Sequence, residues 1–461
     1  IWDQTLPEDT SVPTSGVPDY YPMGGASYGT EFTREDINSA LASDNPFSLV
    51  PSKDANGHGT YLAGLAAGRS FPLQNFTGAA PMSDLAIVKL KPAKKYLRDY
   101  YLIPEKADAF QENDIMMGIK YLRVLADRFR QPLVILLGLG SNYGSHTGSS
   151  PLSQVAQNYG GFFGIATVIA AGNETGLAHH YAGRLSADTS YEDVELRVGK
   201  KEAERGFILE LWSSATELYT VGFVSPGGER INRIPILANN ETRIPFLLEN
   251  TTVTVNYELI EAGSGSQLVS MRFEKPSAGI WTIRVYNTQF LTGDYHMWLP
   301  VQSFISDETV FLKPDPSNTI TVPGNSRLPI TVGAYDHRNN SIYIHSSRGY
   351  ISRDSVKPDL AAPGVDVLGP ANTSVHSGIL KNTQTFTHRT GTSAAAAITA
   401  GAVANLLNWG IVMGNYPTMS EASIKSYLIR GASRNPSLSY PNREFGYGTL
   451  DLLQTFLKLR E

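Results

Sequence analysis

The sequence predicts an α/β protein: a doubly wound, mostly parallel sheet that carries an inserted antiparallel β-sandwich. Short, apolar, β-branched segments end in Gly or polar turns, as strands buried on both faces do, at 84–90, 133–140, 166–173 and 329–336. Between residues 191 and 303 the pattern changes to period-two segments separated by turn clusters such as PGGE and GSGS, which is typical of an antiparallel sandwich.

A helix is expected between the first two strands, because apolar residues recur there at helical spacing, at Ile115, Ile119, Leu122 and Phe129. Alternation of strand, helix and strand produces parallel strands with helices on the faces of the sheet. Such sheets bind ligands at the carboxyl ends of their strands. Gly and Asn residues follow the strands here, so functional residues are expected at that edge.

The α/β pattern resumes after the sandwich, which indicates an insertion rather than an appended domain. The expected boundaries are 1–188 for the first part of the α/β domain, 189–305 for the insert and 306–461 for the second part of the α/β domain.

The composition is that of a packed soluble globule. Hydrophobic residues make up 41% of the chain and charged residues 18%, and the net charge of -5 comes from interspersed acids and bases, so no nucleic-acid surface is expected. The absence of cysteine excludes disulfides, thiolate metal sites and a cysteine nucleophile. No run approaches the roughly 20 apolar residues of a membrane-spanning helix. The start at Ile1, without Met or a signal peptide, indicates a processed or trimmed product.

Two motifs carry potential chemistry. In DANGHGTYLAGLAAG, His58 lies between glycines at the predicted start of a helix, where a structural histidine is the alternative interpretation. In GTSAAAAITAGAVANLL, Ser393 begins a helix rich in Ala and Gly. A serine at that place is either a helix cap or a nucleophile whose own N–H and helix dipole can stabilise negative charge.

Together, HGT at 58–60 and GTSAAAA from Gly391 resemble the His and Ser signatures of the subtilisin-like serine proteases, in the chain order of that family. AAGNETG resembles the strand end whose Asn side chain donates to the oxyanion. The resemblance implies a peptidase without a cofactor or a catalytic metal, with a triad of Asp3, His58 and Ser393 and with Asn173 in the oxyanion hole. It also implies that four residues line the pocket for the side chain that precedes the cleaved bond: Leu139, Gly140, Ala170 and Gly172.

The assignment of the triad acid rests on the shortest of the motif matches. The family's strand ending in Asp-Thr-Gly appears here as IWDQT, and we choose Asp3 because Ile-Trp is typical of a strand end. Other acids also precede His58, at Asp9, Asp19, Asp36 and Asp54. The alternative for Asp3 is an ordinary acid in a surface loop.

The IWDQT form, the stretch GTEFTREDINSAL before NGHGT and the inserted sandwich resemble the clostridial Csp-type spore germination subtilases. That resemblance implies a jelly-roll insert, a propeptide that the enzyme cleaves from itself and that can remain a partner, and a spore or secreted location. It also implies limited cleavage of a spore cortex-hydrolase zymogen as the protein substrate. Because the group includes pseudoproteases, the alternative is a catalytically silent protein that senses a germinant or binds a partner.

The insert and one histidine pair leave further alternatives. Trp212, Tyr219 and Trp281 could stack on sugar in a carbohydrate-binding module, but aromatic residues in sandwich strands are more often core, and we expect the insert to brace the protease. His179 and His180 have no acidic residues at ligand spacing, so we expect a solvated loop rather than a metal site. Neither a nucleic-acid partner nor a membrane is expected.

Overall fold

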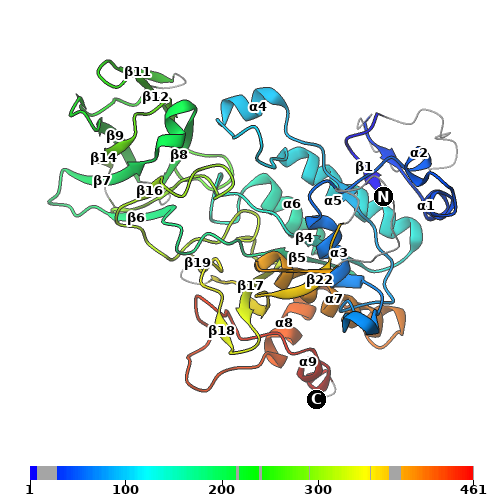
Figure 1. The fold of residues 1–461 in the computed structure, drawn as a ribbon. Coiled ribbons are helices and arrows are strands. Elements are labelled where there is room, and N and C mark those ends of the chain that lie inside the picture. The colour runs from blue at the N-terminus through cyan, green and yellow to red at the C-terminus, as the bar shows by residue number, and fades with distance from the viewer. Residues whose placement is uncertain are drawn as a thin grey trace.

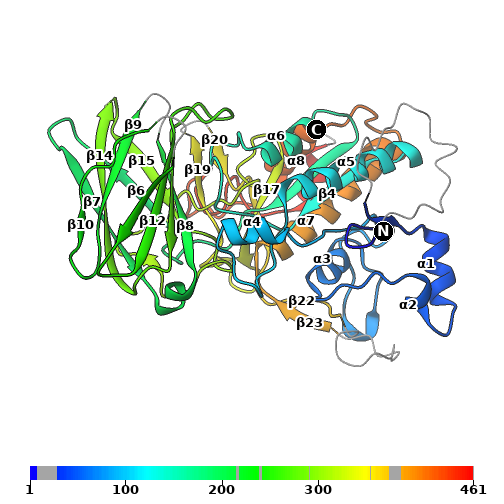
Figure 2. The ribbon, with the colours of Figure 1, turned by 90° about the horizontal axis from the view of Figure 1, so that it is seen from above.

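The computed structural model describes residues 1–7, 28–213, 217–237, 241–289, 291–352, 355–372 and 386–459. An α/β part and a part made of two antiparallel sheets lie side by side (Figures 1 and 2). The chain leaves the α/β part after strand β5 and returns to it before strand β17.

The central sheet of the α/β part has the strand order β18-β17-β5-β4, and β21 also pairs with β17. Its strands are β4 (Leu133–Leu137), β5 (Ile165–Ala170), β17 (Ile330–Asp336), β18 (Ser341–Ile342) and β21 (Leu360–Pro363). All the pairs are parallel except the one between β17 and β18. The predicted parallel sheet is therefore present, with its strands at three of the four predicted segments.

Helices cover both faces of this sheet. On one face lie α5 (Glu112–Phe129) and α6 (Pro151–Tyr159), and on the other lie α7 (Thr392–Leu407) and α8 (Glu421–Gly431). Strand β5 is buried on both sides because its side chains alternate between the two cores, as the unbroken apolar pattern predicts. In α5, Ile115, Ile119 and Leu122 face the core as expected, whereas Phe129 is exposed at the end of the helix.

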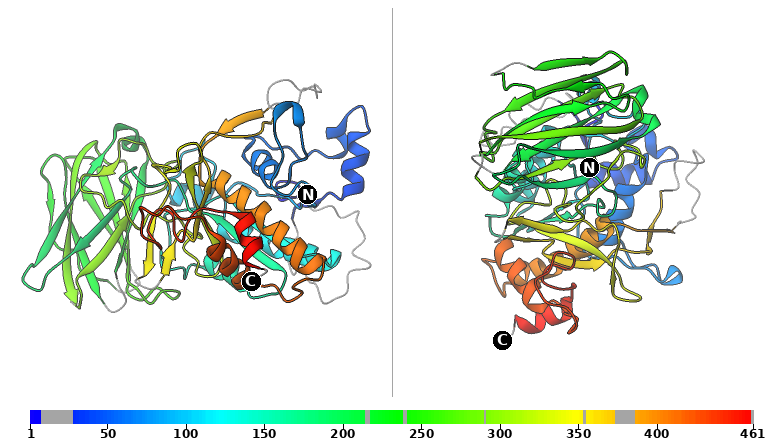
Figure 3. Two further views of the ribbon diagram at one scale, coloured as in Figure 1. Left: turned by 90° about the horizontal axis from the view of Figure 1, so that it is seen from below. Right: turned by 90° about the vertical axis from the view of Figure 1, so that its left-hand side faces the viewer.

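Helix α7 runs through the α/β part (Figure 3, orange) and packs against the sheet and against α3 (His58–Ala67). A Cβ at Gly401 would lie 2.5 Å from the Ala79 Cβ and 2.6 Å from the Ala66 carbonyl oxygen, which explains the small residues of this helix. The segment Thr392–Val412 is long and apolar enough to cross a membrane, although no such segment was predicted from the sequence. Because most of it is buried inside the protein, its apolar character serves the core.

The segment 84–90 forms less of a strand than predicted. Only β3 (Val88–Lys89) is regular, and it joins a small sheet of order β2-β1-β3 rather than the central sheet. In this sheet β1 (Trp2–Asp3) is parallel to β3 and antiparallel to β2 (Thr30–Glu31). The strand is short because its partner β1 has only two residues and because Leu85, before it, is exposed to solvent.

The two remaining large sheets are antiparallel and face each other across one apolar core (Figure 3). The first has the order β10-β9-β14-β7-β16, with β7 (Tyr191–Val198), β9 (Leu218–Val224), β10 (Arg230–Ile231), β14 (Gly279–Gln289) and β16 (Val310–Phe311). The second has the order β11-β12-β13-β8-β15-β6, with β6 (His180–Arg184), β8 (Gly206–Ser213), β11 (Thr242–Phe246), β12 (Thr251–Glu258), β13 (Leu268–Glu274) and β15 (Asp294–Trp298).

These sheets extend beyond residues 189–305 on both sides, because β6 pairs with β15 and β16 pairs with β7. The sequence HYAGR of β6 lacks the β-branched alternation that marks the other strands, so it gave no strand signal. Trp281 and Tyr219 are fully buried in the shared core, and the buried Trp212 indole donates to Glu210. Tyr219 and Trp281 are therefore part of the packing and offer no open face for stacking on sugar, whereas Trp212, although buried, lines a hollow.

Shorter elements complete the described chain. The helices are α1 (Arg34–Leu41), α2 (Pro46–Leu49), α4 (Lys95–Tyr100) and α9 (Leu452–Lys458), with the 3-10 turns Pro72–Gln74 and Lys200–Glu204 and the π-helical turn Asn408–Val412. The strands are β19 (Gly349–Ser352), β20 (Ser355–Lys357), β22 (Val367–Pro370) and β23 (Phe386–Arg389), which form two hairpins. The β22-β23 hairpin leads directly into α7 and so into Ser393.

A buried ion pair anchors the strands that support α7. The Lys357 ammonium donates to Asp359 Oδ2 at 2.7 Å and to the Pro329 carbonyl oxygen at 2.7 Å, and Lys425 Nζ lies 2.6 Å from the other Asp359 oxygen.

Asp359→Asn would leave buried cations without their counterion, which typically costs roughly 3–5 kcal/mol. We expect a clear fall in the midpoint of chemical unfolding, followed by circular dichroism. Asp99→Asn, which removes the exposed ion pair with Lys95, should have a much smaller effect. Equal shifts in the two variants would contradict a stabilising role for the buried pair.

Candidate active site

His58 is the first residue of helix α3, and the residue before it forms an unusual N-cap. Gly57, at the N-cap, has φ 77°, a left-handed conformation that favours glycine. The Asp54 carboxylate accepts hydrogen bonds from the backbone N–H groups of Gly57 and Thr60 at 2.9 and 2.8 Å, and from the Thr60 hydroxyl at 2.7 Å. These bonds fix the start of the helix and therefore the position of the imidazole.

The hydrogen bonds of Asp54 bear on which aspartate can be the acid of the triad. Both Asp54 oxygens are occupied by the cap, and Asp36 is exposed in the capping box of α1. Asp9 and Asp19 lie outside the described residues. Asp3, by contrast, is fully buried at the end of β1.

The Asp3 carboxylate has well-defined partners. Its Oδ1 accepts from the Thr5 N–H at 2.9 Å and from the Thr5 hydroxyl at 2.6 Å, and its Oδ2 accepts from the Lys89 ammonium at 3.0 Å. A side-chain bond from Ser52 adds to these. Burial alone would raise the pKa of Asp3, but the bonds from Thr5, Ser52 and Lys89 outweigh it and lower that pKa, so the carboxyl is ionised. Across the described part of the chain, no hydrogen bond joins Asp3 to His58.

Ser393 is the second residue of α7, where the first backbone N–H groups of the helix have no helical partner. Its hydroxyl donates to the Gly138 carbonyl oxygen at 3.1 Å. A Cβ built on Gly138 would lie 3.5 Å from His58 Cε1 and 3.6 Å from Ser393 Cβ. The structure therefore brings the predicted base and the predicted nucleophile to the same point beside the end of β4, although among the described residues no hydrogen bond links them.

Asn173 meets the same helix from the end of β5. Its Oδ1 accepts from the Thr392 N–H at 3.0 Å and from the Thr392 hydroxyl at 3.2 Å, and the hydroxyl in turn accepts from the Gly172 N–H at 3.1 Å. With its oxygen held in this way, the amide group of Asn173 presents its N–H bonds beside the start of α7. Sequence reasoning missed Thr392, although its place next to Ser393 in GTS could have drawn attention to it.

The four residues predicted to line the substrate pocket follow β4 and β5. Gly140 is exposed and Gly172 is partly exposed, so the backbone at both is accessible. Leu139 packs against the core below α5 and α6, and the Ala170 methyl group lies in the core below α7. Among the four predicted lining residues, the accessible ones are therefore the two glycines.

The electrostatic surroundings of His58 favour its neutral form. Burial lowers the pKa of His58 most, and the Arg389 guanidinium lowers it further, while Asp54 and Asp108 act in the opposite direction. Arg389, at the end of β23, donates to the Asn56 carbonyl oxygen at 3.3 Å. A neutral imidazole can accept a proton, as a general base must.

Arg389→Gln should move the acid limb of the pH profile of kcat/KM to higher pH. Without the guanidinium the imidazolium is less disfavoured, so the pKa of His58 rises and the neutral, active form is lost at a higher pH as the solution is acidified. Initial rates on one peptide between pH 5 and pH 8 measure the shift. Arg389→Lys keeps the charge and should leave the acid limb in place, and an unmoved limb in Arg389→Gln would show that Arg389 does not act on His58.

Comparison with known proteins identifies the family. Residues 307–448 match the Subtilase family. The structure of the CspB protease of Clostridium perfringens is similar to this one with a TM-score of 0.81 and 30% sequence identity, over 94% of this chain and 87% of that one. The chain belongs to the subtilase family. The resemblance drawn from the HGT and GTS motifs is thereby confirmed, as is the predicted α/β fold.

This subtilase is also 32% identical over 129 residues to the serine protease AprX of Bacillus subtilis strain 168. That match spans 26% of the subtilase and 28% of AprX. Both relatives are proteases by name, so the subtilase stands in a family of serine proteases together with them.

The histidine pair of the subtilase does not lie in a solvated loop as predicted. His179 and His180 are buried, because the antiparallel sheets begin earlier than the sequence indicated. His179 Nδ1 lies 2.8 Å from Glu174 Oε2, and His180 Nδ1 donates to the Asp315 carbonyl oxygen at 3.1 Å. Among the described residues, no group of His, Asp and Glu side chains could hold a metal ion.

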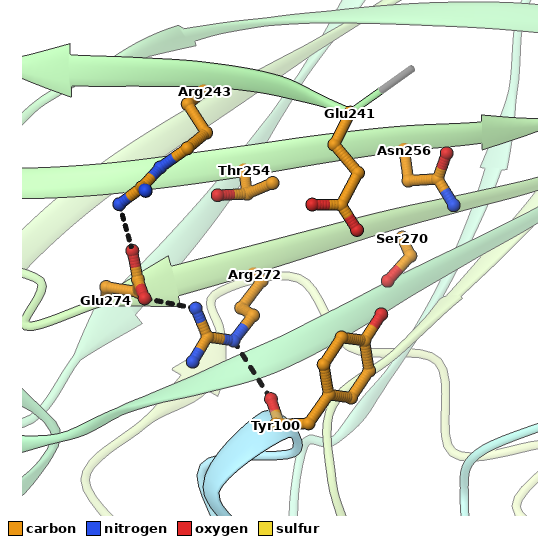
Figure 4. A pocket seen from close by; sticks show the side chains of 8 residues that line it. All are labelled: Tyr100, Glu241, Arg243, Thr254, Asn256, Ser270, Arg272 and Glu274. Carbon is orange, nitrogen blue, oxygen red and sulfur yellow. Dashed lines mark hydrogen bonds and ion pairs between the residues drawn. The ribbon is translucent and has the colours of Figure 1, made fainter. Parts of the chain in front are cut away.

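Two hollows have lining residues that do not include His58, Ser393 or Asn173. A cavity of about 630 Å³ separates the α/β part from the antiparallel sheets, and its rim includes His146 stacked on Trp298 at 3.8 Å. A smaller polar pocket of about 240 Å³ lies between α4 and the second sheet (Figure 4). There Arg243 and Arg272 both pair with Glu274, and Arg272 also donates to the Tyr100 carbonyl oxygen at 2.9 Å. These bonds tie α4 to the sheet and pair Arg243 and Arg272 with Glu274.

Proposed function

We propose that Ser393 is the nucleophile of this subtilisin-like serine endopeptidase. The observation that carries the proposal is that the His58 and Ser393 side chains both lie against Gly138, with Asn173 beside the start of α7. A nucleophile, a base within reach and oxyanion donors are the parts that acyl transfer requires.

In the proposed mechanism His58 takes the proton of the Ser393 hydroxyl as its oxygen attacks the peptide carbonyl. The tetrahedral oxyanion accepts hydrogen bonds from the Asn173 amide and the Ser393 backbone N–H. His58 then gives the proton to the leaving amine, and water hydrolyses the acyl-enzyme by the same steps in reverse. The Ser393 backbone N–H and the dipole at the start of α7 favour the negative charge of the oxyanion.

Asp3 is the proposed acid, which orients His58 and stabilises its charged form. Its carboxylate is ionised and buried, as this role requires, but it is bound by Lys89, Thr5 and Ser52. Catalytic hydrogen bonds are often long without substrate and tighten in the Michaelis complex. We infer that Asp3 accepts from His58 Nδ1 when the substrate closes the site, while Thr5 keeps its hold on the other oxygen.

The substrate and the setting follow from the likeness to the Csp-type group. We propose limited cleavage of a spore cortex-hydrolase zymogen, a location in the spore or outside the cell, and a cleaved propeptide as a second partner. The 30% identity with CspB over most of both chains supports this placement. We expect the purified subtilase to cleave such a zymogen at one bond and the Ser393→Ala variant to leave it intact. General digestion of the zymogen would contradict the proposal.

We also propose that the antiparallel sheets form a jelly-roll domain inserted between two parts of the catalytic domain, close to the boundaries 1–188, 189–305 and 306–461. Its role would be to brace the catalytic domain. The hydrogen bonds between α4 and the second sheet support this role, because they hold a segment that follows β3.

Labelling with a fluorophosphonate probe tests the proposed nucleophile. The probe phosphonylates a serine only if that serine is activated by its neighbours. Wild type should be labelled, peptide mapping should place the adduct on Ser393, and Ser393→Ala should stay unlabelled. A folded wild type that takes no label would favour the alternative of a silent protein that binds a germinant or a partner.

A further inference from the structure

We propose that Thr321 closes the bottom of the substrate pocket, and that this protease therefore cleaves after residues with small side chains. The inference rests on the proposed function and gives it a substrate class. It rests on the position of the Thr321 side chain, which fills the space between the two accessible walls, Gly140 and Gly172.

The Thr321 side chain touches both walls. A Cβ on Gly140 would lie 2.7 Å from the Thr321 Cβ, and a Cβ on Gly172 would lie 2.6 Å from its Cγ2 and 2.8 Å from its Oγ1. These distances are shorter than van der Waals contact, so the threonine lies directly against the backbone of both segments. A substrate side chain that enters between the walls meets the threonine.

Thr321 cannot easily move aside. Its backbone N–H donates to the Ala171 carbonyl oxygen at 3.0 Å, and its hydroxyl donates to the same oxygen at 3.3 Å. The next residue, Val322, exchanges two backbone hydrogen bonds with Ser141, at 2.8 and 2.9 Å. Thr321 is 3% exposed, and its β-branched side chain has few rotamers. The segment thus links both walls of the pocket and holds the threonine at its floor.

The chemistry of this floor favours small and uncharged side chains. Ala, Ser and Gly would need little depth between the walls, whereas Leu, Phe and Tyr would have to displace Thr321 from a segment fixed at both ends. Excluding one methylene group from a pocket typically discriminates about 10- to 200-fold. We therefore expect kcat/KM for Ala before the cleaved bond to exceed that for Phe by at least about 100-fold.

The test uses fluorogenic peptides that differ only in the residue before the cleaved bond, with Ala, Leu or Phe. They are assayed on wild type, Thr321→Ala and Thr321→Gly. Each rate is divided by the amount of active enzyme, which fluorophosphonate labelling measures. Wild type should prefer Ala, and both variants should gain rate on Phe by about tenfold or more, with the larger gain in the glycine variant. Thr319→Ala removes a buried threonine of the same segment whose hydroxyl bonds to Thr175, and it should keep the wild-type preference.

Two outcomes would overturn the inference. One is a labelled wild type that cleaves after Phe as readily as after Ala. The other is a labelled Thr321→Ala variant with an unchanged preference. A wild type that takes no label would instead contradict the proposed function, so the two failures can be told apart.

Discussion

Asp3→Asn is expected to lower turnover by about four orders of magnitude, because an uncharged partner no longer holds His58 in the tautomer that accepts the serine proton. The substitution keeps the size of the buried side chain and its contact with Thr5. The fold should therefore survive, and kcat measured on a peptide substrate should fall without a matching rise in KM.

Asp36→Asn provides a matched control, since Asp36 is an exposed capping acid of α1 and should leave turnover unchanged. Asp54→Asn tests the partly exposed acid that caps α3, and any effect on turnover should come through the start of that helix. If Asp3→Asn retained most of its activity while Asp54→Asn lost it, Asp54 would replace Asp3 as the acid.

Asn173→Ala is expected to lower kcat by about 10²- to 10³-fold, the usual result of losing one oxyanion donor. The effect should fall on kcat rather than KM, because the charge on the oxygen exists only after attack. Removing the side chain also frees the Thr392 N–H and hydroxyl that it binds, so a modest loss of stability should accompany the loss of activity. Steady-state kinetics with thermal unfolding measures both.

Asn339→Ala is a suitable comparison, because Asn339 lies in an exposed turn where its side chain, among the described residues, bonds to Ser341 alone. It should leave kcat unchanged. Wild-type turnover in a folded Asn173→Ala variant would place the oxyanion elsewhere.

The parts of the molecule that could be predicted from sequence are those fixed by local pattern. The strands around Leu133, Ala166 and Pro329 are continuous apolar runs because helices cover both of their faces. Consecutive residues of each strand must therefore be apolar, which is visible in the sequence. His58 and Ser393 could be proposed because each lies at the start of a helix in a short, specific motif. Both signals are local in the chain, so no tertiary information was needed to see them.

The parts that escaped prediction depend on contacts between distant segments. The partners of Asp3 include Lys89, which lies 86 positions along the chain. His179 and His180 have no acidic residues at ligand spacing and were assigned to a solvated loop, yet both are buried, and His180 contacts the distant residues Asp315 and His296. Thr321 carries no motif, and its place between Gly140 and Gly172 appears only when the segments after β4 and β5 meet the segment before β17.

The position of the antiparallel sheets has a consequence for the order in which this chain can fold. Strands β5 and β17 are direct neighbours, although most strands of the two antiparallel sheets lie between them in the chain. Joining them from an unfolded chain would cost the entropy of closing a very long loop. The folded antiparallel sheets shorten that loop, because the segments by which the chain enters and leaves them are hydrogen-bonded to each other, from the Phe311 N–H to the Ala178 carbonyl oxygen and from the Asp315 N–H to the His180 carbonyl oxygen. Destabilised antiparallel sheets should therefore delay folding of the enzyme while leaving the chemistry of every molecule that does fold intact.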